Sequence, residues 1–455
     1  MLPVSCKFLL ALFSYILYET MGKSNQNAEK LKNVLKGIIS RMADNSGLFS
    51  RNPGSDFTRK RKLDFATLIH LILSMRGNSI GKELLDYFEP QNLMTASAFV
   101  QQRDKLLPEA FEYLFREFND SCTDDLTYEG YHLLAVDGSD INIPKNLESD
   151  TYFEQGFNQF HLNALYDLMN KTYVDAIIQP APKEHEVRAC IDMVNRQAFK
   201  PKTILIADRG YESFNLIEHI YRRPNLDFLI RVKNAGTKEI RELPLTDLDI
   251  EVSFELRNTM TNADKEAFAK GEAKYISAAY GKKKPKKYTS WDFETPYRLG
   301  YRVVRFKVTD DTYETIVTSL DKDTFPPEKI KKLYAMRWGI ETSFRELKYA
   351  IGVINFHAKK EDFIIQEIYA SLIMYNFCER ITLSVVISQK DSRKHTYQVN
   401  FTMAIHVCRD FFSSNRPPPD MVALIKRYIL PVREGRADKR KIKPQKVITF
   451  IYRVA

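Results

Sequence analysis

Cysteine and glycine are scarce in this chain. Its 455 residues include 5 cysteines and 17 glycines, and successive cysteines lie at least 30 positions apart. Because no CxxC pair occurs, the sequence excludes a zinc ribbon and a disulfide framework. The five thiols are therefore predicted to be free, as in a reducing cytosol. Glycine falls well below its usual ~7%, which excludes collagen-like and glycine-rich linker architectures.

Long hydrophobic runs are also missing. The apolar run from Phe8 to Tyr18 has 11 residues, whereas a membrane-spanning helix needs about 20. Only Lys7 precedes this run and no small-residue cleavage site follows it, which disfavours a signal peptide. We interpret it as a buried segment or as translated sequence upstream of Met21. No membrane partner is expected, and the predicted location is the cytoplasm.

Basic residues are in excess, with 68 Lys+Arg against 58 Asp+Glu and a net charge of +10. Net charge alone allows either nucleic acid or an anionic membrane surface as the partner. The basic residues gather at 59–62, 282–287 and 433–446. A basic run is often only a solvated loop, but basic clusters around a core with acidic motifs favour DNA.

Changes in residue pattern divide the chain into five segments. Apolar residues such as Leu31 and Leu35 recur at helical spacing near the N-terminus, which predicts helices there. Short apolar runs alternating with helical stretches predict a mixed α/β sheet further along, and strict apolar–polar alternation predicts an antiparallel insertion. The segments are a helical N-terminal domain that is a candidate DNA-binding unit (23–125), a first core part (126–234), a β insertion (235–322), a second core part (323–390) and a basic C-terminal region (391–455).

Two acids follow apolar strand candidates. Asp137 comes directly after the run LLAV, and Asp208 comes directly after the run ILIA. A carboxylate at that position lies at the carboxyl edge of a sheet, where α/β proteins bind ligands. The alternative for Asp137 is a simple turn with Gly138, and Asp140 competes with it as the functional acid.

The segment from Pro327 to about Gly352 predicts one helix with a polar stripe beside its apolar face. At about 100° per residue, five polar residues share an arc of about 80°, and apolar residues occupy the adjacent arc. A solvated face with an i,i+4 pair of Glu341 and Arg345 would show the same charges. Such a face usually lies opposite the apolar one, so partial burial of the stripe is favoured. The stripe consists of Tyr334, Arg337, Glu341, Arg345 and Lys348.

Three carboxylates brought together in this way have a known chemistry. Asp137, Asp208 and Glu341 could hold two Mg²⁺ ions about 3.5–4 Å apart, which would activate water and stabilise a leaving oxygen. Because the ligands are oxygens alone, Mg²⁺ or Mn²⁺ is favoured over zinc. Arg345 and Lys348 on the same helix would then contact a phosphate backbone.

Three other features admit a functional and a structural interpretation. Trp291 is either a stacking platform for a flipped base or, more commonly, a core tryptophan. Trp338 is interpreted as packing next to Arg337. The run Glu184-His185-Glu186 suggests a metal site, but acids in the first turn of a helix are the commoner explanation.

At these residues the sequence resembles a known family. Tyr334-x2-Arg337-x3-Glu341-x6-Lys348 is similar to the Tyr-Arg-Glu-Lys signature of DDE insertion-sequence transposases of the insertion-sequence-four type. The motif VDGSDI around Asp137 resembles the first acid motif of that family, and IADRGYES resembles the second. The resemblance covers roughly residues 60 to 390.

The resemblance implies an α/β fold with an RNase H-like catalytic core interrupted by an antiparallel β insertion. It also implies cut-and-paste transposition, with Mg²⁺-dependent cleavage at terminal inverted repeats followed by strand transfer to target DNA. Synapsis of two ends implies a homodimer at work, in a bacterial cytoplasm and associated with the nucleoid. By this resemblance the catalytic metal ligands are Asp137, Asp208 and Glu341, and the residues that contact DNA phosphates are Tyr334, Arg337 and Lys348.

Two other functions fit parts of the same sequence. An RNase H-like nuclease would use the same carboxylates without strand transfer. A DNA-binding regulator without catalysis would use only the N-terminal helices and the basic C-terminal region. The presence of all three acids favours an active transposase over the regulator.

Overall fold

The computed structural model describes residues 26–432, except for 60, 235–236, 279–289, 310–311, 386, 388–394 and 415–419. The apolar run near the N-terminus and the basic clusters 282–287 and 433–446 lie outside the described residues. Within the described residues, no helix is both long enough and apolar enough to cross a membrane. The cysteines described there, at 122, 190, 378 and 408, are free, as the sequence predicts.

The chain folds into two compact units, which we call the helical unit and the sheet unit. The sheet unit comprises Asp125–Asp140 and His161–Thr342. The helical unit joins the N-terminal part of the chain to Ile141–Phe160 and to the part from Ser343 onward. Parts of the predicted N-terminal and C-terminal segments therefore belong to the same unit.

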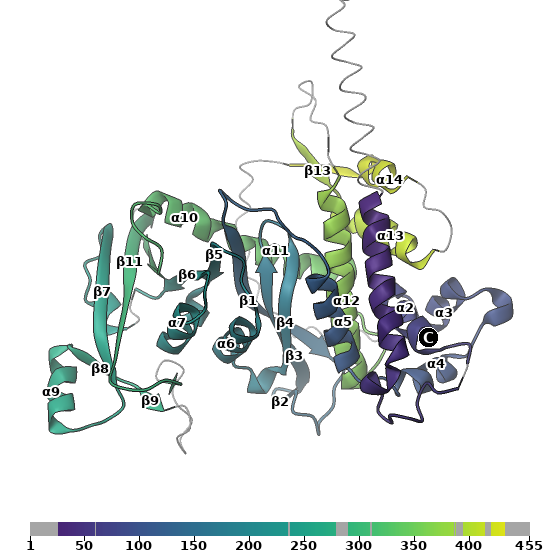
Figure 1. Cartoon of the computed structure of the whole chain (residues 1–455), viewed down its shortest axis with the longest axis horizontal. Coiled ribbons are helices and arrows are strands. Elements are labelled where there is room, and N and C mark those ends of the chain that lie inside the picture. The colour runs from purple at the N-terminus through teal and green to yellow at the C-terminus, as the bar shows by residue number, and fades with distance from the viewer. Residues whose placement is uncertain are drawn as a thin grey trace, which may run out of the picture. The chain divides into compact units, whose positions relative to one another are not determined.

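The helical unit is built around α12 (Glu361–Leu383), which is buried along most of its length. A helix that is apolar on all sides belongs in the centre of a bundle, and α12 packs against α2, α5 and α13 (Figure 1). Lys32 fixes the first helix to α13 by donating to the carbonyl of Phe411 at 2.6 Å. The elements are a helix over 26–44, η1 (Ser46–Phe49), α2 (Phe65–Ser74), α3 (Ile80–Tyr87), η2 (Pro90–Asn92), α4 (Ala96–Arg103), α5 (Glu109–Asp120), β2 (Tyr152–Phe153), α12, β13 (Tyr397–Val399), α13 (Phe401–Ser413), α14 (Met421–Arg427) and β14 (Ile429–Pro431).

A buried ionic network links α3, α12 and the segment before α12. His357 lies 3.1 Å from Glu367 through Nδ1 and 3.7 Å from Glu83 through Nε2. Burial alone would lower the pKa of His357, but the hydrogen bonds and charges of the two carboxylates raise it from 6.5 to about 9. The charge of Arg103 and the bond to His357 lower the pKa of Glu367 to about 2, and the bond to His357 with nearby backbone N–H groups does the same for Glu83, against the effect of burial.

We expect this network to make stability depend on alkaline pH. A raised pKa of His357 stabilises the folded state fully below pH 6.5, and the stabilisation is lost as pH rises through about 9. This shift of the pKa corresponds to about 3 kcal/mol of unfolding free energy. The figure applies to the whole network and is not added again for Glu83 and Glu367. Urea unfolding at about pH 6 and about pH 9.5 should show this loss, and the His357→Gln variant should be less stable at the lower pH and lack the dependence. An equal pH dependence in both proteins would contradict the assignment to His357.

The sheet unit contains most of a ten-stranded mixed sheet. The strand order is β2-β3-β1-β5-β6-β12-β11-β7-β8, with β4 paired to β3. β1, β5 and β6 are parallel, whereas β6, β12, β11 and β7 follow one another antiparallel. The strands are β1 (His132–Ile143), β3 (Phe157–Asp167), β4 (Thr172–Pro180), β5 (Thr203–Ala207), β6 (Leu226–Val232), β7 (Leu248–Arg257), β8 (Ala273–Tyr275), β11 (Tyr297–Thr309) and β12 (Thr312–Thr318), with the small pair β9 (Ser277–Ala278) and β10 (Ser290–Trp291).

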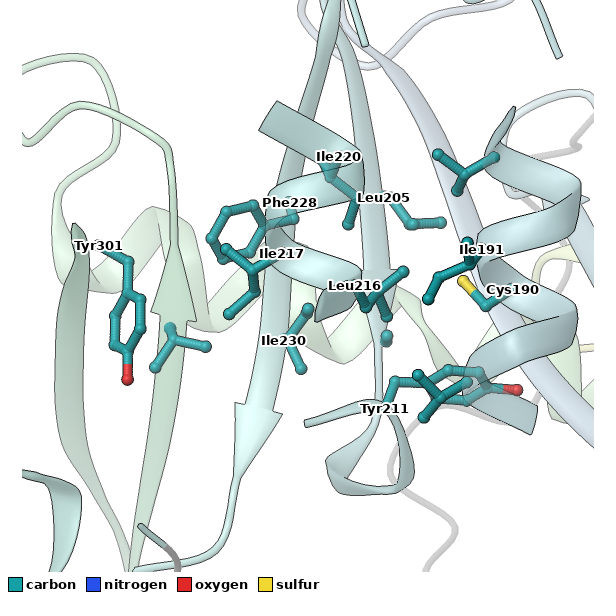
Figure 2. Close-up of a cluster of buried hydrophobic side chains, with 14 of the residues drawn as sticks. Cys190, Ile191, Leu205, Tyr211, Leu216, Ile217, Ile220, Phe228, Ile230 and Tyr301 are labelled. Atoms are coloured by element: carbon teal, nitrogen blue, oxygen red, sulfur yellow. The ribbon is translucent and has the colours of Figure 1, made fainter. Parts of the chain in front are cut away.

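Helices cover both faces of the central strands, which explains why those strands have continuous apolar runs. Even-numbered residues of β1, such as Leu134 and Val136, face α6 and α7. Odd-numbered Leu133 faces α10. Figure 2 shows the first cluster, with Cys190 and Ile191 of α6 and Leu216, Ile217 and Ile220 of α7 beside Leu205, Phe228 and Ile230. The helices and short turns are η3 (Ala181–Lys183), α6 (Glu186–Arg196), η4 (Arg209–Tyr211), α7 (Phe214–Tyr221), α8 (Lys238–Arg241), α9 (Asn262–Lys270), α10 (Pro327–Met336), α11 (Trp338–Glu346) and the π-helical turn η5 (Leu347–Ile351).

Two local expectations differ from the structure. β1 does not end at Asp137 but continues to Ile143. The helix expected over 327–352 is interrupted at Arg337 and ends in a π-helical turn. The long strands of the segment 235–322 extend the sheet that contains β1, β5 and β6.

Candidate active site

The register of β1 and β5 sets Asp137 beside Asp208. The two strands are parallel, and their last paired residues are Val136 and Ala207, so the two aspartates occupy the next position on neighbouring strands. Side chains in register on parallel strands project from the same face. Alternation assigns that face to the side of Leu133, which α10 covers.

Asp208 is held by the turn that follows β5. Its carboxylate Oδ1 accepts a hydrogen bond from the backbone N–H of Gly210 at 2.6 Å and thereby caps η4. Although β1 continues past Asp137, its pairing with β5 stops one residue earlier. Both carboxylates therefore lie where the ladder between β1 and β5 opens, which is the edge that the sequence pattern indicated.

Arg337 joins Asp137 to Glu341. The guanidinium donates to Oδ2 of Asp137 at 3.2 Å and to Oε1 of Glu341 at 2.5 Å. Its side chain is only 7% exposed, whereas both carboxylates are partly open to solvent. The break between α10 and α11 falls at Arg337, which is the C-cap of α10. The interruption therefore coincides with the residue that contacts acids from two elements.

The electrostatics of this edge favour a bound cation. Burial, together with the charges of Asp208 and Glu341, raises the pKa of Asp137 to about 6, against the opposing effects of the Gly138 N–H and Arg337. Burial alone would lower the pKa of Arg337, but its bond to Glu341 and the nearby negative charges raise it. Three carboxylates and one guanidinium have a formal charge of −3 + 1 = −2. An oxygen-only donor set with this charge fits Mg²⁺ or Mn²⁺.

The other residues of the predicted stripe lie in different environments. Tyr334 on α10 is buried in the apolar cluster that contains Leu133, so its ring packs in the core. Arg345 is exposed near the end of α11, and Lys348 is half-buried in the π-helical turn. Both belong to the helical unit, whereas Arg337 belongs to the sheet unit.

Trp291 does not have the environment of a stacking platform. It is 3% exposed and belongs to the core cluster on the α6 and α7 face. Its ring packs against Phe293 and Tyr297, and its indole N–H donates to the carbonyl of Glu294 at 3.3 Å. This is the core position that the sequence left open as the alternative, because a buried indole offers no free face to a base.

Trp338 is the exposed aromatic residue beside the acids. It is 54% exposed, and the guanidinium carbon of Arg337 lies 5.4 Å from its ring centre. From the sequence, Trp338 is expected only to pack next to Arg337. On the helical projection it falls about 40° from Tyr334, which is beside the polar stripe, so the same pattern could have indicated its exposure.

Comparison with known proteins identifies the family. The model of the transposase DDE domain matches residues 128–377, which is more than half of the chain. The chain therefore belongs to the family of DDE transposases. Among solved structures, "Cryo-EM structure of piggyBac transposase synaptic complex with hairpin DNA" is similar at 10% identity, covering 87% of this chain and 78% of that chain, with a TM-score of 0.43. No curated protein matches the chain.

Proposed function

We propose that this transposase is of the insertion-sequence-four type and moves an insertion sequence by cut-and-paste transposition. The observation that carries the proposal is the register of β1 and β5, which sets Asp137 beside Asp208 on the face where Arg337 and Glu341 lie. The Tyr-Arg-Glu-Lys signature on α10 and α11 supports this type. The family match supports the transposase activity.

An RNase H-like core is part of the proposal. The neighbouring strands β4, β3 and β1 are consecutive in the chain apart from the short β2, and β1 is followed by the parallel strands β5 and β6. This order places the first long strand in the centre, as an RNase H-like core requires. The strands β7, β8, β11 and β12 would correspond to the insertion, added to the edge of that core beyond β6.

In the proposed mechanism, Asp137, Asp208 and Glu341 hold two divalent ions. These ions would supply Lewis-acid activation of water and charge stabilisation of the leaving oxygen. Arg337 keeps Asp137 and Glu341 aligned, because its two donors reach one oxygen of each. The N–H of Gly210 orients Asp208. The chain thereby fixes the carboxylates before DNA arrives.

We assign the DNA contacts mainly to exposed groups. Arg345 and Lys348 are proposed to bind phosphates near the transposon end, and Trp338 offers a ring for base stacking. Arg337 acts on the carboxylates, so its effect on DNA is indirect, and the hydroxyl of buried Tyr334 remains a candidate for one phosphate. Two protein copies are proposed to hold the two ends during synapsis.

Cleavage of a donor plasmid tests the proposed function. A supercoiled plasmid with the element's two terminal repeats should be cut at the repeat boundaries when Mg²⁺ is added, and the freed 3′-OH ends should join to target DNA. Cutting without joining would indicate a nuclease. Binding to the repeats without cutting would indicate a regulator, and either result would overturn the proposal.

A further inference from the structure

A second group of metal-ligating side chains lies on the other face of the same sheet edge. It consists of Asp140 on β1, His161 on β3 and Glu184 just before α6. One possible ligand atom from each residue lies within 4.8 Å of those of the other two. Among the described residues, no other set of three or more His, Cys, Asp or Glu side chains meets this criterion. His161 Nδ1 is 2.7 Å from Asp140 Oδ1 and 2.8 Å from Glu184 Oε2.

Strand alternation separates this group from the acids of the active site. On β1, Asp137 projects toward α10, so Gly138 and Asp140 face the α6 side. A Cβ atom built on Gly138 would lie 2.1 Å from His161 Nε2 and 3.1 Å from Glu186 Oε1. The imidazole therefore packs directly on the backbone next to Asp137, and only glycine leaves room for it there.

The imidazole is buried, while the carboxylates are open. His161 is 5% exposed, but the side chains of Asp140 and Glu184 are 54% and 43% exposed. An ion could therefore reach the carboxylates from solvent and find a buried nitrogen behind them. All three residues belong to the sheet unit.

Three carboxylates surround the two nitrogens of the imidazole. Nδ1 faces two carboxylate oxygens but carries at most one hydrogen. Nε2 is buried and has no hydrogen-bond partner, and Glu186 Oε1 is 3.5 Å away. A metal at Nδ1 would take the place of the proton that faces Asp140 and Glu184, and the other ring N–H would point to Glu186. A metal-bound histidine commonly has such a carboxylate behind its second nitrogen.

We propose that Asp140, His161 and Glu184 bind a divalent first-row transition-metal ion, with Glu186 orienting the imidazole. An imidazole ligand suits Zn²⁺, Fe²⁺ or Ni²⁺ better than Mg²⁺, and the two carboxylates also suit Mn²⁺. The ion would tie β1, β3 and the start of α6 together at Gly138. It would thus brace the backbone that places Asp137, without taking part in the cleavage proposed above.

The test uses the full-length chain with the other acids neutralised. The variant Asp137→Asn/Asp208→Asn/Glu341→Gln removes the three carboxylates of the candidate active site. Mn²⁺ binding to the second group can then be measured independently of DNA cleavage. Titration with Mn²⁺, followed by the loss of the free-ion EPR signal, should show one bound ion in this background. Pulsed EPR of the bound ion should show coupling to a ¹⁴N nucleus, because a carboxylate-only site would lack it. A background variant that binds no Mn²⁺, or binds it without ¹⁴N coupling, overturns the proposal.

Single replacements in this background identify the ligands. His161→Asn should weaken Mn²⁺ binding by at least about 10-fold and remove the ¹⁴N coupling. Asp140→Asn should weaken it similarly, and its exposed side chain makes loss of folding no concern. The matched control is His185→Asn, because His185 caps α6 through its side chain and Asn preserves a cap. Full Mn²⁺ affinity in a folded Asp140→Asn or His161→Asn protein would overturn the assignment.

Discussion

Replacing Glu341 by Gln or Asp208 by Asn is expected to reduce Mg²⁺-dependent DNA cleavage by at least about 10³-fold. Each change keeps the size of the side chain but removes the negative charge that binds the metal ions. Charge stabilisation of the attacking and leaving oxygens is the main contribution expected from this site. The measurement is the initial rate of cutting on the plasmid substrate with two terminal repeats.

Binding to the DNA ends should survive these replacements. Loss of a carboxylate lowers the repulsion of phosphates, so affinity for the repeats should be unchanged or higher when measured without Mg²⁺. The matched control is Glu328→Gln, because Glu328 is an exposed glutamate in the first turn of α10. This variant should cut at the wild-type rate. If Glu341→Gln also cut at that rate, Glu341 would not be a metal ligand.

The local pattern of the sequence predicts well the two strands that carry Asp137 and precede Asp208. β5 covers the apolar run ILIA before Asp208, and β1 covers the run LLAV before Asp137. This agreement has a physical reason. Central parallel strands are covered on both faces, so their apolar runs are continuous and end where the next polar residue meets solvent, as at Asp208.

The break at Arg337 could not be predicted from helical periodicity. The residues around it have no proline or glycine in the preceding turn, and the apolar spacing continues through it. The interruption coincides with contacts to Asp137, which is 200 positions away in the sequence. Long-range contacts of this kind are absent from a local pattern, so the projection treated α10 and α11 as one helix.

The sequence also did not predict which aromatic residues are buried or which distant residues come together. Trp291 and Trp338 are both aromatic residues in polar surroundings, yet one is in the core and the other is exposed. Likewise, the run Glu184-His185-Glu186 contains a histidine, but the structure brings His161 to Glu184 instead. For Glu184 the deciding neighbour, His161, comes from the strand β3, and such long-range packing is what the sequence alone does not specify.

Arg103 in the helical unit is expected to have the largest effect on stability. It lies at the end of α4, is 1% exposed, and donates to Glu367 at 2.8 Å and to Gln366 at 2.8 Å. Its third bond goes to the carbonyl of Phe363 at 2.6 Å, so one guanidinium ties α4 to three residues of α12.

Replacing Arg103 by Met should lower the free energy of unfolding of the helical unit by about 3–5 kcal/mol. The new side chain fills similar space but leaves Glu367 as a buried charge with one fewer partner, and breaking a buried pair from one side typically costs this much. Urea unfolding followed by circular dichroism measures the change. The control Lys82→Met breaks an exposed i,i+4 pair with Asp86 and should cost less than about 1 kcal/mol. Water can solvate the exposed Asp86 when it loses its partner, but it cannot solvate the buried Glu367 in the same way. Equal, small losses of unfolding free energy in the two variants would therefore contradict the role of Arg103.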